Sequence, residues 1–449
     1  MMQEDTICAL ATAPGGALGI VRISGPATFT AVSAICSVHC AQVLPNTTHY
    51  THIIDDESGT IDEAMVTIYR APHSYTGEDS AEISCHGSRY ILNKVLELLL
   101  KHGCRMAQPG EFTMRAYLNG KMDLSQAEAV ADLIASTNHA THRLAMSQLR
   151  GGITSELAQL RSQLLKLTSL LELELDFSDH EDLEFADRTE LLQLALTIEN
   201  HIARLAHSFE TGQALKQGIP VAIVGKTNVG KSTLLNCLLN DERAIVSDIH
   251  GTTRDTIEDT VDIQGVTFRF IDTAGIRQTD DEIEQIGINR TYAAIEKARI
   301  VVWVIDRPPG EEEERDMSRR CKDKKLIVAY NKCDESSDTS RLILPCLPIS
   351  AKFGTNIDHL EDAIYDAANI PSLKETDIII SNARHYEALT RAQQGITRVI
   401  SGLQQQLSGD LIAEDLRQVL SELAEITGEG KITPNEVLGN IFQHFCVGK

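Results

Sequence analysis

A glycine-rich segment in the middle of the chain has the residue types and spacing of a phosphate-binding loop. It reads GKTNVGKS (225–232) and lies between the apolar run 221–224 and the helical stretch 233–239. In such loops backbone N–H groups surround phosphates at the start of a helix. We therefore expect Lys231 to reach the terminal phosphates and Ser232 to bind Mg²⁺. The flanking strand and helix argue against a chance glycine-rich turn.

Three later motifs supply the other parts of a nucleotide site. DTAG (272–275) follows the run 266–271 and would place Asp272 at the carboxyl edge of a sheet, holding a metal-bound water, with Gly275 near the γ-phosphate. NKCD (331–334) follows the run 326–329, and the Asp334 carboxylate accepts hydrogen bonds from guanine N1–H and its exocyclic amine, which adenine lacks. SAK (350–352) adds a backbone N–H for guanine O6. The base is therefore predicted to be guanine.

Residues between these motifs are candidates for the hydrolytic machinery. Thr253 is the expected second Mg²⁺ ligand, from a switch loop. The glutamine that orients water in Ras-like enzymes is replaced by Ile276, and no arginine is evidently aimed at the phosphates, so a cation or second subunit would have to supply charge. Glu284 lies in an acidic run that by itself indicates only a solvated segment. The predicted GTP contacts are Asn228, Val229, Gly230, Lys231, Ser232, Thr233, Ser247, Asp248, Ile249, His250, Gly251, Thr252, Thr253, Asp272, Thr273, Ala274, Gly275, Asn331, Lys332, Asp334, Ser350, Ala351 and Lys352.

Composition limits the partners and the compartment. The 41 basic and 64 acidic side chains give a formal charge of −23, a field that repels nucleic acid unless a partner helps. Ten cysteines without a Cys-x-x-Cys pair, and no secretory leader, predict reduced thiols in the cytoplasm. Cys36 and Cys40 lack the further ligands of a zinc site and are interpreted as packing residues. No apolar run has the roughly 20 residues that span a bilayer.

The elements that position these motifs change character three times along the chain. Short β-rich runs at 19–24, 65–69 and 81–84 predict a compact α+β domain, and leucines at helical spacing from 157 to 167 predict long helices. Continuous apolar strands at 221–224, 300–305 and 326–329 then predict an α/β domain with a parallel sheet. Helical periodicity returns after 371, so the α/β domain is inserted into a helical one. The predicted domains are 1–119, 120–215, 216–372 and 373–449, the second and fourth forming one helical domain.

Motifs outside the nucleotide site resemble the MnmE (TrmE) family of tRNA-modifying GTPases over nearly the whole chain. They are DTI (5–7), GIVRISG (19–25), SYTGED (74–79), HG (86–87), PGEF (109–112), RA (115–116), NGKMDL (119–124) and FCVGK (445–449). The family's last motif typically reads FCIGK, a conservative difference. The resemblance implies an N-terminal folate-binding α+β domain, a central helical domain and an inserted Ras-like P-loop GTPase domain.

The resemblance also implies site residues that the pattern alone does not. Arg22, Glu82, Lys121 and Lys449 match positions that bind formyl-tetrahydrofolate; without the resemblance they would be interpreted as surface or salt-bridge residues. Potassium ligands of the family map onto Asn228, Ser247, Ile249 and Thr252. Glu284 matches the glutamate that activates water.

Partners follow from the same resemblance. It implies a homodimer whose GTPase domains pair in the GTP state, and a flavin-dependent partner, MnmG, forming a heterotetramer that installs a carboxymethylaminomethyl-type group on carbon 5 of the wobble uridine of certain tRNAs. Two alternatives stay open: an assembly factor that binds ribosomal RNA, for which no basic RNA-binding domain is visible, and an N-terminal domain that only dimerises. The sequence does not decide whether Cys446 takes part in chemistry.

Overall fold

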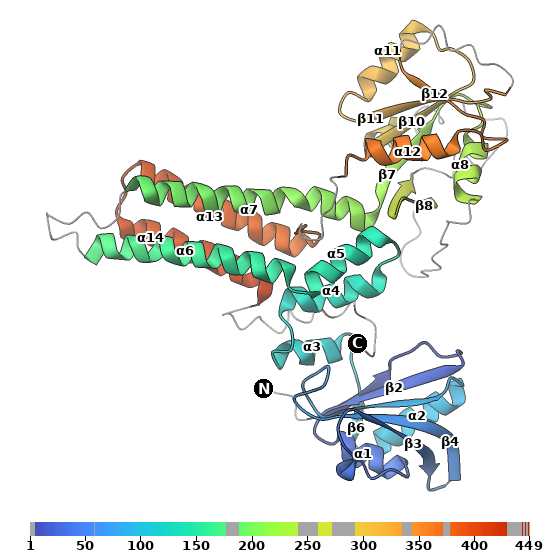
Figure 1. Cartoon of the computed structure of the whole chain (residues 1–449), viewed down its shortest axis with the longest axis vertical. Helices are drawn as coiled ribbons and strands as arrows, with labels where there is room; N and C mark the ends of the chain where they lie inside the picture. Colours follow the sequence, from blue (N-terminus) through green and yellow to red (C-terminus); the bar gives the residue numbers. More distant parts are fainter. Residues whose placement is uncertain are drawn as a thin grey trace. The chain divides into compact units, whose positions relative to one another are not determined.

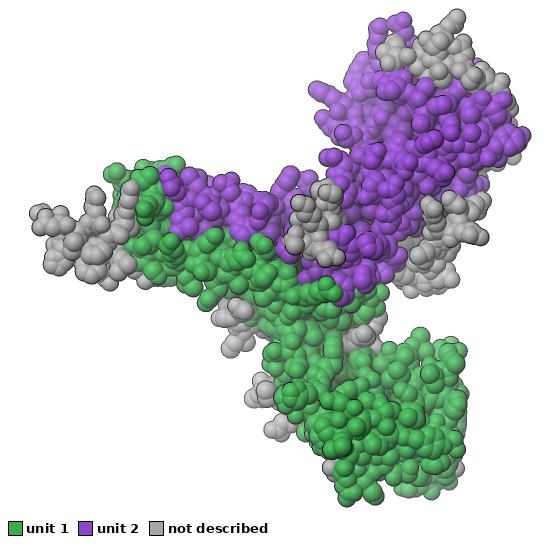
Figure 2. Space-filling view, viewed as in Figure 1, with its two compact units in different colours: residues 1–134, 148–191, 398–449 green, residues 135–147, 192–397 purple. Residues whose placement is uncertain are grey.

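The computed structural model describes residues 5–57, 59–176, 188–240, 259–271, 292–334, 344–370, 378–428 and the single residues 442, 445 and 448. The chain forms two compact units (Figure 2). Unit 1 contains Met1–Ile134, Gln148–Leu191 and Arg398–Lys449, and unit 2 contains Ala135–Ser147 and Leu192–Thr397. Among the described residues, none of the helices is both long and apolar enough to cross a membrane.

The N-terminal part of unit 1 is a six-stranded mixed sheet with two helices. The strands are β1 (Thr6–Leu10), β2 (Leu18–Ser24), β3 (Thr47–Asp55), β4 (Gly59–Tyr69), β5 (Ser80–His86) and β6 (Cys104–Met106), in the order β3-β4-β5-β2-β1-β6. The helices are α1 (Thr28–Ile35) and α2 (Arg89–Lys101), with a 3-10 turn, η1 (Cys40–Gln42). All neighbouring strands are antiparallel except β1 and β6. The α+β prediction is confirmed, with its three expected strands inside β2, β4 and β5.

Alternation along these strands separates the face that packs on α1 and α2 from the opposite face of the sheet. Val21, Ile23 and Ile83 are fully buried and belong to one apolar cluster with α1 and α2, while Arg22 and Glu82 between them point to the other face. Cys36 and Cys40 lie in the same core, as expected of packing residues. The nine cysteines in the described part of the chain are free thiols.

The helical part is assembled from segments that are distant in sequence. Its helices are α3 (Glu111–Leu118), α4 (Leu124–Ala135), α5 (His139–Leu149), α6 (Gly152–Asp176), α7 (Arg188–Gln217), α13 (Ala383–Gln404) and α14 (Gly409–Thr427). In unit 1, α6 packs against α14, and the two lie side by side in Figure 1. Leu157, Leu160, Leu164 and Leu167 on α6 are buried, as their spacing predicted. The helix expected after 371 is also present: on α14 Ile412, Leu416, Val419 and Leu423 are buried, while Leu411 is 58% exposed.

The α/β part of unit 2 is a second six-stranded sheet, in the order β12-β11-β10-β7-β9-β8. Its strands are β7 (Ile219–Val224), β8 (Asp259–Ile263), β9 (Val266–Phe270), β10 (Ile300–Ile305), β11 (Lys325–Tyr330) and β12 (Cys346–Pro348), and its helices are α8 (Lys231–Asn240), α11 (Glu311–Arg320) and α12 (Ile357–Ala367). Only β8 is antiparallel to its neighbour. Every residue of β10 is buried, with apolar clusters on both faces of the sheet. The predicted parallel α/β sheet is confirmed.

Helix α5 begins against the β8–β9 hairpin. Asn138 caps the helix, because its Oδ1 accepts the Thr141 N–H at 2.8 Å, and its Nδ2 donates to Thr267 Oγ1 on β9 at 2.6 Å. The Ala140 N–H donates to the Gly265 carbonyl in the hairpin turn at 3.1 Å, and the Ala140 side chain joins the core of the α/β part. The first residues of α5 are therefore packed as part of unit 2.

Candidate nucleotide-binding site

The glycine-rich loop connects β7 to α8, and two of its glycines are required by close packing. Gly225 has φ +152°, and a Cβ there would lie 2.3 Å from the Val304 carbonyl oxygen on β10. Gly230 has φ +98°, and its Cβ would lie 2.2 Å from Nδ2 of Asn331. No other residue type fits either position without displacing backbone or a buried side chain. The two glycines therefore let the loop pack closely against β10 and Asn331.

The Lys231 side chain folds back over this loop. Its Nζ donates to the carbonyl oxygens of Gly225 at 2.8 Å and Lys226 at 2.6 Å. Burial lowers the pKa of Lys231, because the ammonium loses hydration. An anion in the loop would supply the compensating negative charge. Lys231 is thus placed to bind phosphate, and Ser232, next to it in the first turn of α8, offers an oxygen of the kind that Mg²⁺ prefers.

Asn331 joins the phosphate loop to the segment predicted to contact the base. Its Nδ2 donates to the Val229 carbonyl at 2.8 Å, and its Oδ1 accepts the Ala351 N–H at 2.9 Å. The Asn331 residue is 3% exposed, so both hydrogen bonds are shielded from water. Three motifs that are distant in sequence therefore meet at one amide.

Asp334 and Ser350 also meet, as a guanine site requires. Ser350 Oγ donates to Asp334 Oδ1 at 2.6 Å, which orients the carboxylate. Ser350 is 1% exposed, whereas Asp334 lies at the surface, open to a ligand. The Ala351 N–H is already used by Asn331. Within the described residues the Lys352 N–H has no hydrogen-bond partner, which makes it the free backbone donor of this tripeptide.

Asp306 is a residue of this site that the sequence analysis did not single out. Its Oδ2 lies 2.9 Å from Lys332 Nζ. The sequence pattern could have indicated this contact, because Asp306 directly follows β10 and Lys332 closely follows β11. These two strands are parallel neighbours. Side chains at the carboxyl ends of adjacent parallel strands meet at one edge of the sheet.

Several predicted residues lie outside the described part of the chain. They are Ser247, Asp248, Ile249, His250, Gly251, Thr252, Thr253, Asp272, Thr273, Ala274, Gly275, Glu284, Cys446 and Lys449. Of the expected potassium ligands the structure places Asn228 alone, at the exposed turn of the phosphate loop with φ +63°. Asn228 offers oxygen atoms there, the donor type that suits hard cations.

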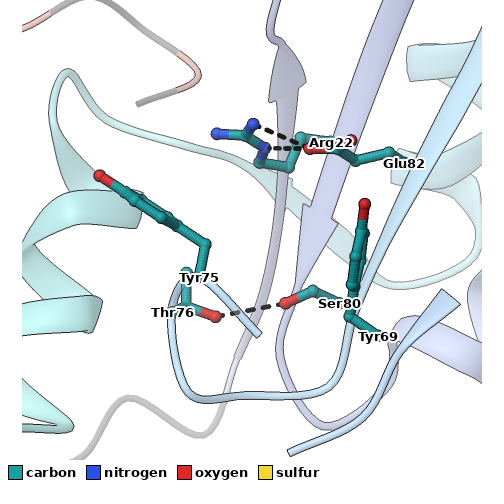
Figure 3. Close-up of a pocket in the computed structure, with 6 residues that line it drawn as sticks. All are labelled: Arg22, Tyr69, Tyr75, Thr76, Ser80 and Glu82. Atoms are coloured by element: carbon teal, nitrogen blue, oxygen red, sulfur yellow. Dashed lines mark hydrogen bonds and ion pairs between the residues drawn. The ribbon is translucent and has the colours of Figure 1, made fainter. Parts of the chain in front are cut away.

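A second candidate site lies on the face of the N-terminal sheet opposite to α1 and α2. A cavity of about 190 Å³ is lined by Arg22, Tyr69, Tyr75, Thr76, Ser80 and Glu82 (Figure 3). Arg22 and Glu82 are cross-strand neighbours on β2 and β5, and two guanidinium nitrogens lie 2.8 and 2.9 Å from Glu82 Oε1. Burial raises the pKa of both Tyr69 and Tyr75, so their hydroxyls stay protonated at neutral pH. The tyrosines were not predicted as lining residues.

The C-terminal end of the chain reaches the same arginine. Arg22 Nη1 donates to the Gly448 carbonyl at 3.0 Å. Gly448 directly precedes Lys449, which was predicted to bind folate together with Arg22. Lys121 does not line the cavity; its Nζ donates to the Pro72 carbonyl at 2.9 Å, in the loop between β4 and β5. The structure thus brings Arg22 and Glu82 together and leaves Lys121 outside the cavity.

Comparisons with known proteins match the chain to two family models and to full-length relatives. A family model described as the MnmE helical domain matches residues 124–446, and one described as the GTP-binding protein TrmE N-terminus matches residues 6–121. The chain is 54% identical over 498 residues to the tRNA modification GTPase MnmE of Phocaeicola vulgatus and 53% identical over 469 residues to that of Bacteroides thetaiotaomicron. Both alignments cover 100% of each chain.

A solved structure, the G domain of the T. maritima FeoB iron transporter, aligns with 33% of this chain and 98% of its own at 25% identity. Its TM-score of 0.25 is too low to support an argument, so the assignment depends on the full-length relatives. The chain belongs to the MnmE family of tRNA modification GTPases.

Proposed function

We propose that this protein is a potassium-dependent GTPase that helps to install a carboxymethylaminomethyl-type group on carbon 5 of the wobble uridine of certain tRNAs. The observation that carries the proposal is the Asn331 amide, which ties the phosphate loop to the guanine-reading segment in a chain of the MnmE family. Family membership favours this function over an assembly factor that binds ribosomal RNA. The acidic charge of −23 favours a partner that brings the basic surface for tRNA.

In the proposed nucleotide site each group has a separate task. The amide groups of the loop and Lys231 bind the phosphates, Asp334 and the 350–352 backbone bind guanine, and Ser232 with Thr253 holds Mg²⁺. Glu284 accepts a proton from the attacking water, directly or through a second water. Potassium, held by Asn228, Ser247, Ile249 and Thr252, would supply the positive charge that an arginine provides in other GTPases.

The cavity on the N-terminal sheet is proposed to hold part of formyl-tetrahydrofolate. Its volume of about 190 Å³ is smaller than the roughly 300–1,000 Å³ of sites that enclose a whole drug-sized ligand. Its lining residues would therefore hold the pterin ring alone, with Tyr69 and Tyr75 offering aromatic faces and Glu82 a hydrogen-bond acceptor. The ammonium groups of Lys121 and Lys449 would complement the carboxylates of the ligand.

The larger assembly is a further part of the proposal. We propose the domain boundaries 1–119, 120–215, 216–372 and 373–449, a cytoplasmic homodimer, and a heterotetramer with a flavin-dependent, MnmG-like protein. In the proposed homodimer a second copy of the chain would add residues beside the cavity that Arg22 and Glu82 line, and so help to enclose the ligand.

Two measurements test the proposal. Mass spectrometry of wobble uridines from cells lacking the gene, complemented with the parent chain, is expected to show loss and return of the modification. GTP turnover by the purified parent is expected in potassium and not in sodium, and Glu284→Ala should retain GTP binding without turnover. Unmodified uridines after complementation would refute the tRNA function, and equal rates in the two salts would refute the cation's role.

A further inference from the structure

An ion pair beside the phosphate loop joins Lys332, a predicted GTP contact, to Asp306, which has no role in the proposed chemistry. Asp306, the first residue after β10, lies 2.9 Å from Lys332 Nζ, and the same Nζ donates to the Asn228 carbonyl at 3.0 Å. The carboxylate is 27% exposed and the lysine side chain 37%, so both are partly shielded. One ammonium group therefore connects the end of β10 to the backbone of the phosphate loop.

The Asn228 carbonyl controls the direction of a backbone N–H. In a planar trans peptide the C=O of one residue and the N–H of the next point in opposite directions. When Lys332 holds the Asn228 carbonyl on the outside of the loop, the Val229 N–H must therefore point to the inside. The next peptide is held likewise, because the Val229 carbonyl accepts from Asn331 and so directs the Gly230 N–H.

Consecutive inward N–H groups form a concave binding site for an anion. Neither the Val229 nor the Gly230 N–H donates a hydrogen bond within the part of the chain that the structure describes. Asn228 itself has φ +63° and Lys332 has φ +61°, a left-handed conformation that asparagine adopts readily and lysine seldom. The contact between the two residues restrains both.

We infer that Asp306 is a positioning residue for the phosphate-binding loop, acting through Lys332 and the Asn228 carbonyl. Asp306 holds the Lys332 ammonium where it donates to the Asn228 carbonyl. The Val229 N–H is thereby directed at the β-phosphate of a bound nucleotide. This inference rests on the proposed guanine-nucleotide site. It adds a residue that no phosphate, metal or base needs to touch.

Electrostatics and positioning predict opposite effects of removing this charge. Without Asp306 the site becomes more positive, so charge alone predicts tighter binding of a polyphosphate. Loss of positioning predicts weaker binding of nucleotides that have a β-phosphate, because the loop N–H groups that surround it are less well oriented. The sign of the change in affinity therefore distinguishes the two effects.

The test measures the affinities of the full-length protein for GDP and for GMP, by displacement of a fluorescent GDP analogue. Asp306→Asn is expected to weaken GDP binding roughly three- to tenfold and GMP binding less than about twofold. Asp306→Glu, which keeps the carboxylate, should recover part of the loss. Asp316→Asn is the matched control, because it removes an equally short pair with Arg320 (2.8 Å) on α11 that does not contact the loop.

Each possible change in nucleotide affinity either supports or contradicts the positioning role of Asp306. Unchanged or tighter GDP binding by Asp306→Asn would overturn the inference, as would an equal loss for GDP and GMP, which indicates general damage to the fold. A parent chain that does not bind GDP at all would instead refute the proposed function and remove the basis of the inference. A selective loss for GDP, absent in Asp316→Asn, supports it.

Discussion

Replacing Asn331 by alanine should destabilise the α/β part by an amount that follows from its two buried hydrogen bonds. The substitution leaves the Val229 carbonyl and the Ala351 N–H without partners at a site that is 3% exposed in the parent. Each lost bond to a buried group costs about 1–2 kcal/mol, so we expect a loss of roughly 2–4 kcal/mol in the free energy of unfolding. Because both partners are backbone groups, no side-chain rearrangement restores them.

Urea unfolding followed by tryptophan fluorescence measures this loss in the α/β part. The chain has one tryptophan, Trp303, which lies on β10 and is 2% exposed. A slope of about 2 kcal/mol per molar urea converts the expected loss into a midpoint about 1–2 M lower. Asn200→Ala is the matched control, since Asn200 donates to Leu196 at the exposed surface of α7. An Asn331→Ala midpoint equal to that of the control would refute the reasoning.

Three further predictions concern single side chains. Asp334→Asn should weaken GTP binding and shift the preference toward xanthosine triphosphate, because an acceptor for the guanine amine becomes a donor; unchanged guanine affinity in a competition assay would contradict the assignment. Arg22→Ala, which also leaves Glu82 without its partner, should weaken 5-formyl-tetrahydrofolate binding at least about tenfold by calorimetry on the full chain, and equal heats of binding would count against the folate site. Asn138→Ala removes a helix cap and the bond to Thr267, and should lower the stability reported by Trp303 by about 1–2 kcal/mol, with an unaltered transition as the contrary result.

Local patterns were sufficient wherever one strand or helix decides the outcome. The apolar run of β10 predicted a strand buried on both faces, and the leucines of α6 predicted a buried stripe, because burial follows directly from side-chain period. Leu411 shows that an apolar residue type alone does not indicate burial. It lies next to Ile412, which begins the buried stripe Ile412, Leu416, Val419 and Leu423, and it is 58% exposed because it falls outside that stripe.

Contacts between distant segments were the part that the sequence could not provide. The identity of the phosphate loop followed from its motif, but the ion pair of Asp306 with Lys332 depends on the register that aligns Ile305 with Tyr330. Likewise, nothing near Asn138 indicates that it contacts Thr267, more than a hundred residues later. The cavity residues Tyr69 and Tyr75 were missed because they come from the end of β4 and the loop after it, which only the sheet order β4-β5-β2 brings to Arg22.

The pairing of α6 with α14 has a consequence for biosynthesis. Leu160, Leu164 and Leu167 are fully buried in the finished protein, yet α14 begins at Gly409 and is made more than 200 residues after them. At ~5–20 residues per second the ribosome needs roughly 10–50 s to cover that interval. The whole α/β part, which ends with α12 (Ile357–Ala367), is made within this interval, before α14 exists. Burial of the α6 leucines against α14 is therefore a late step of synthesis.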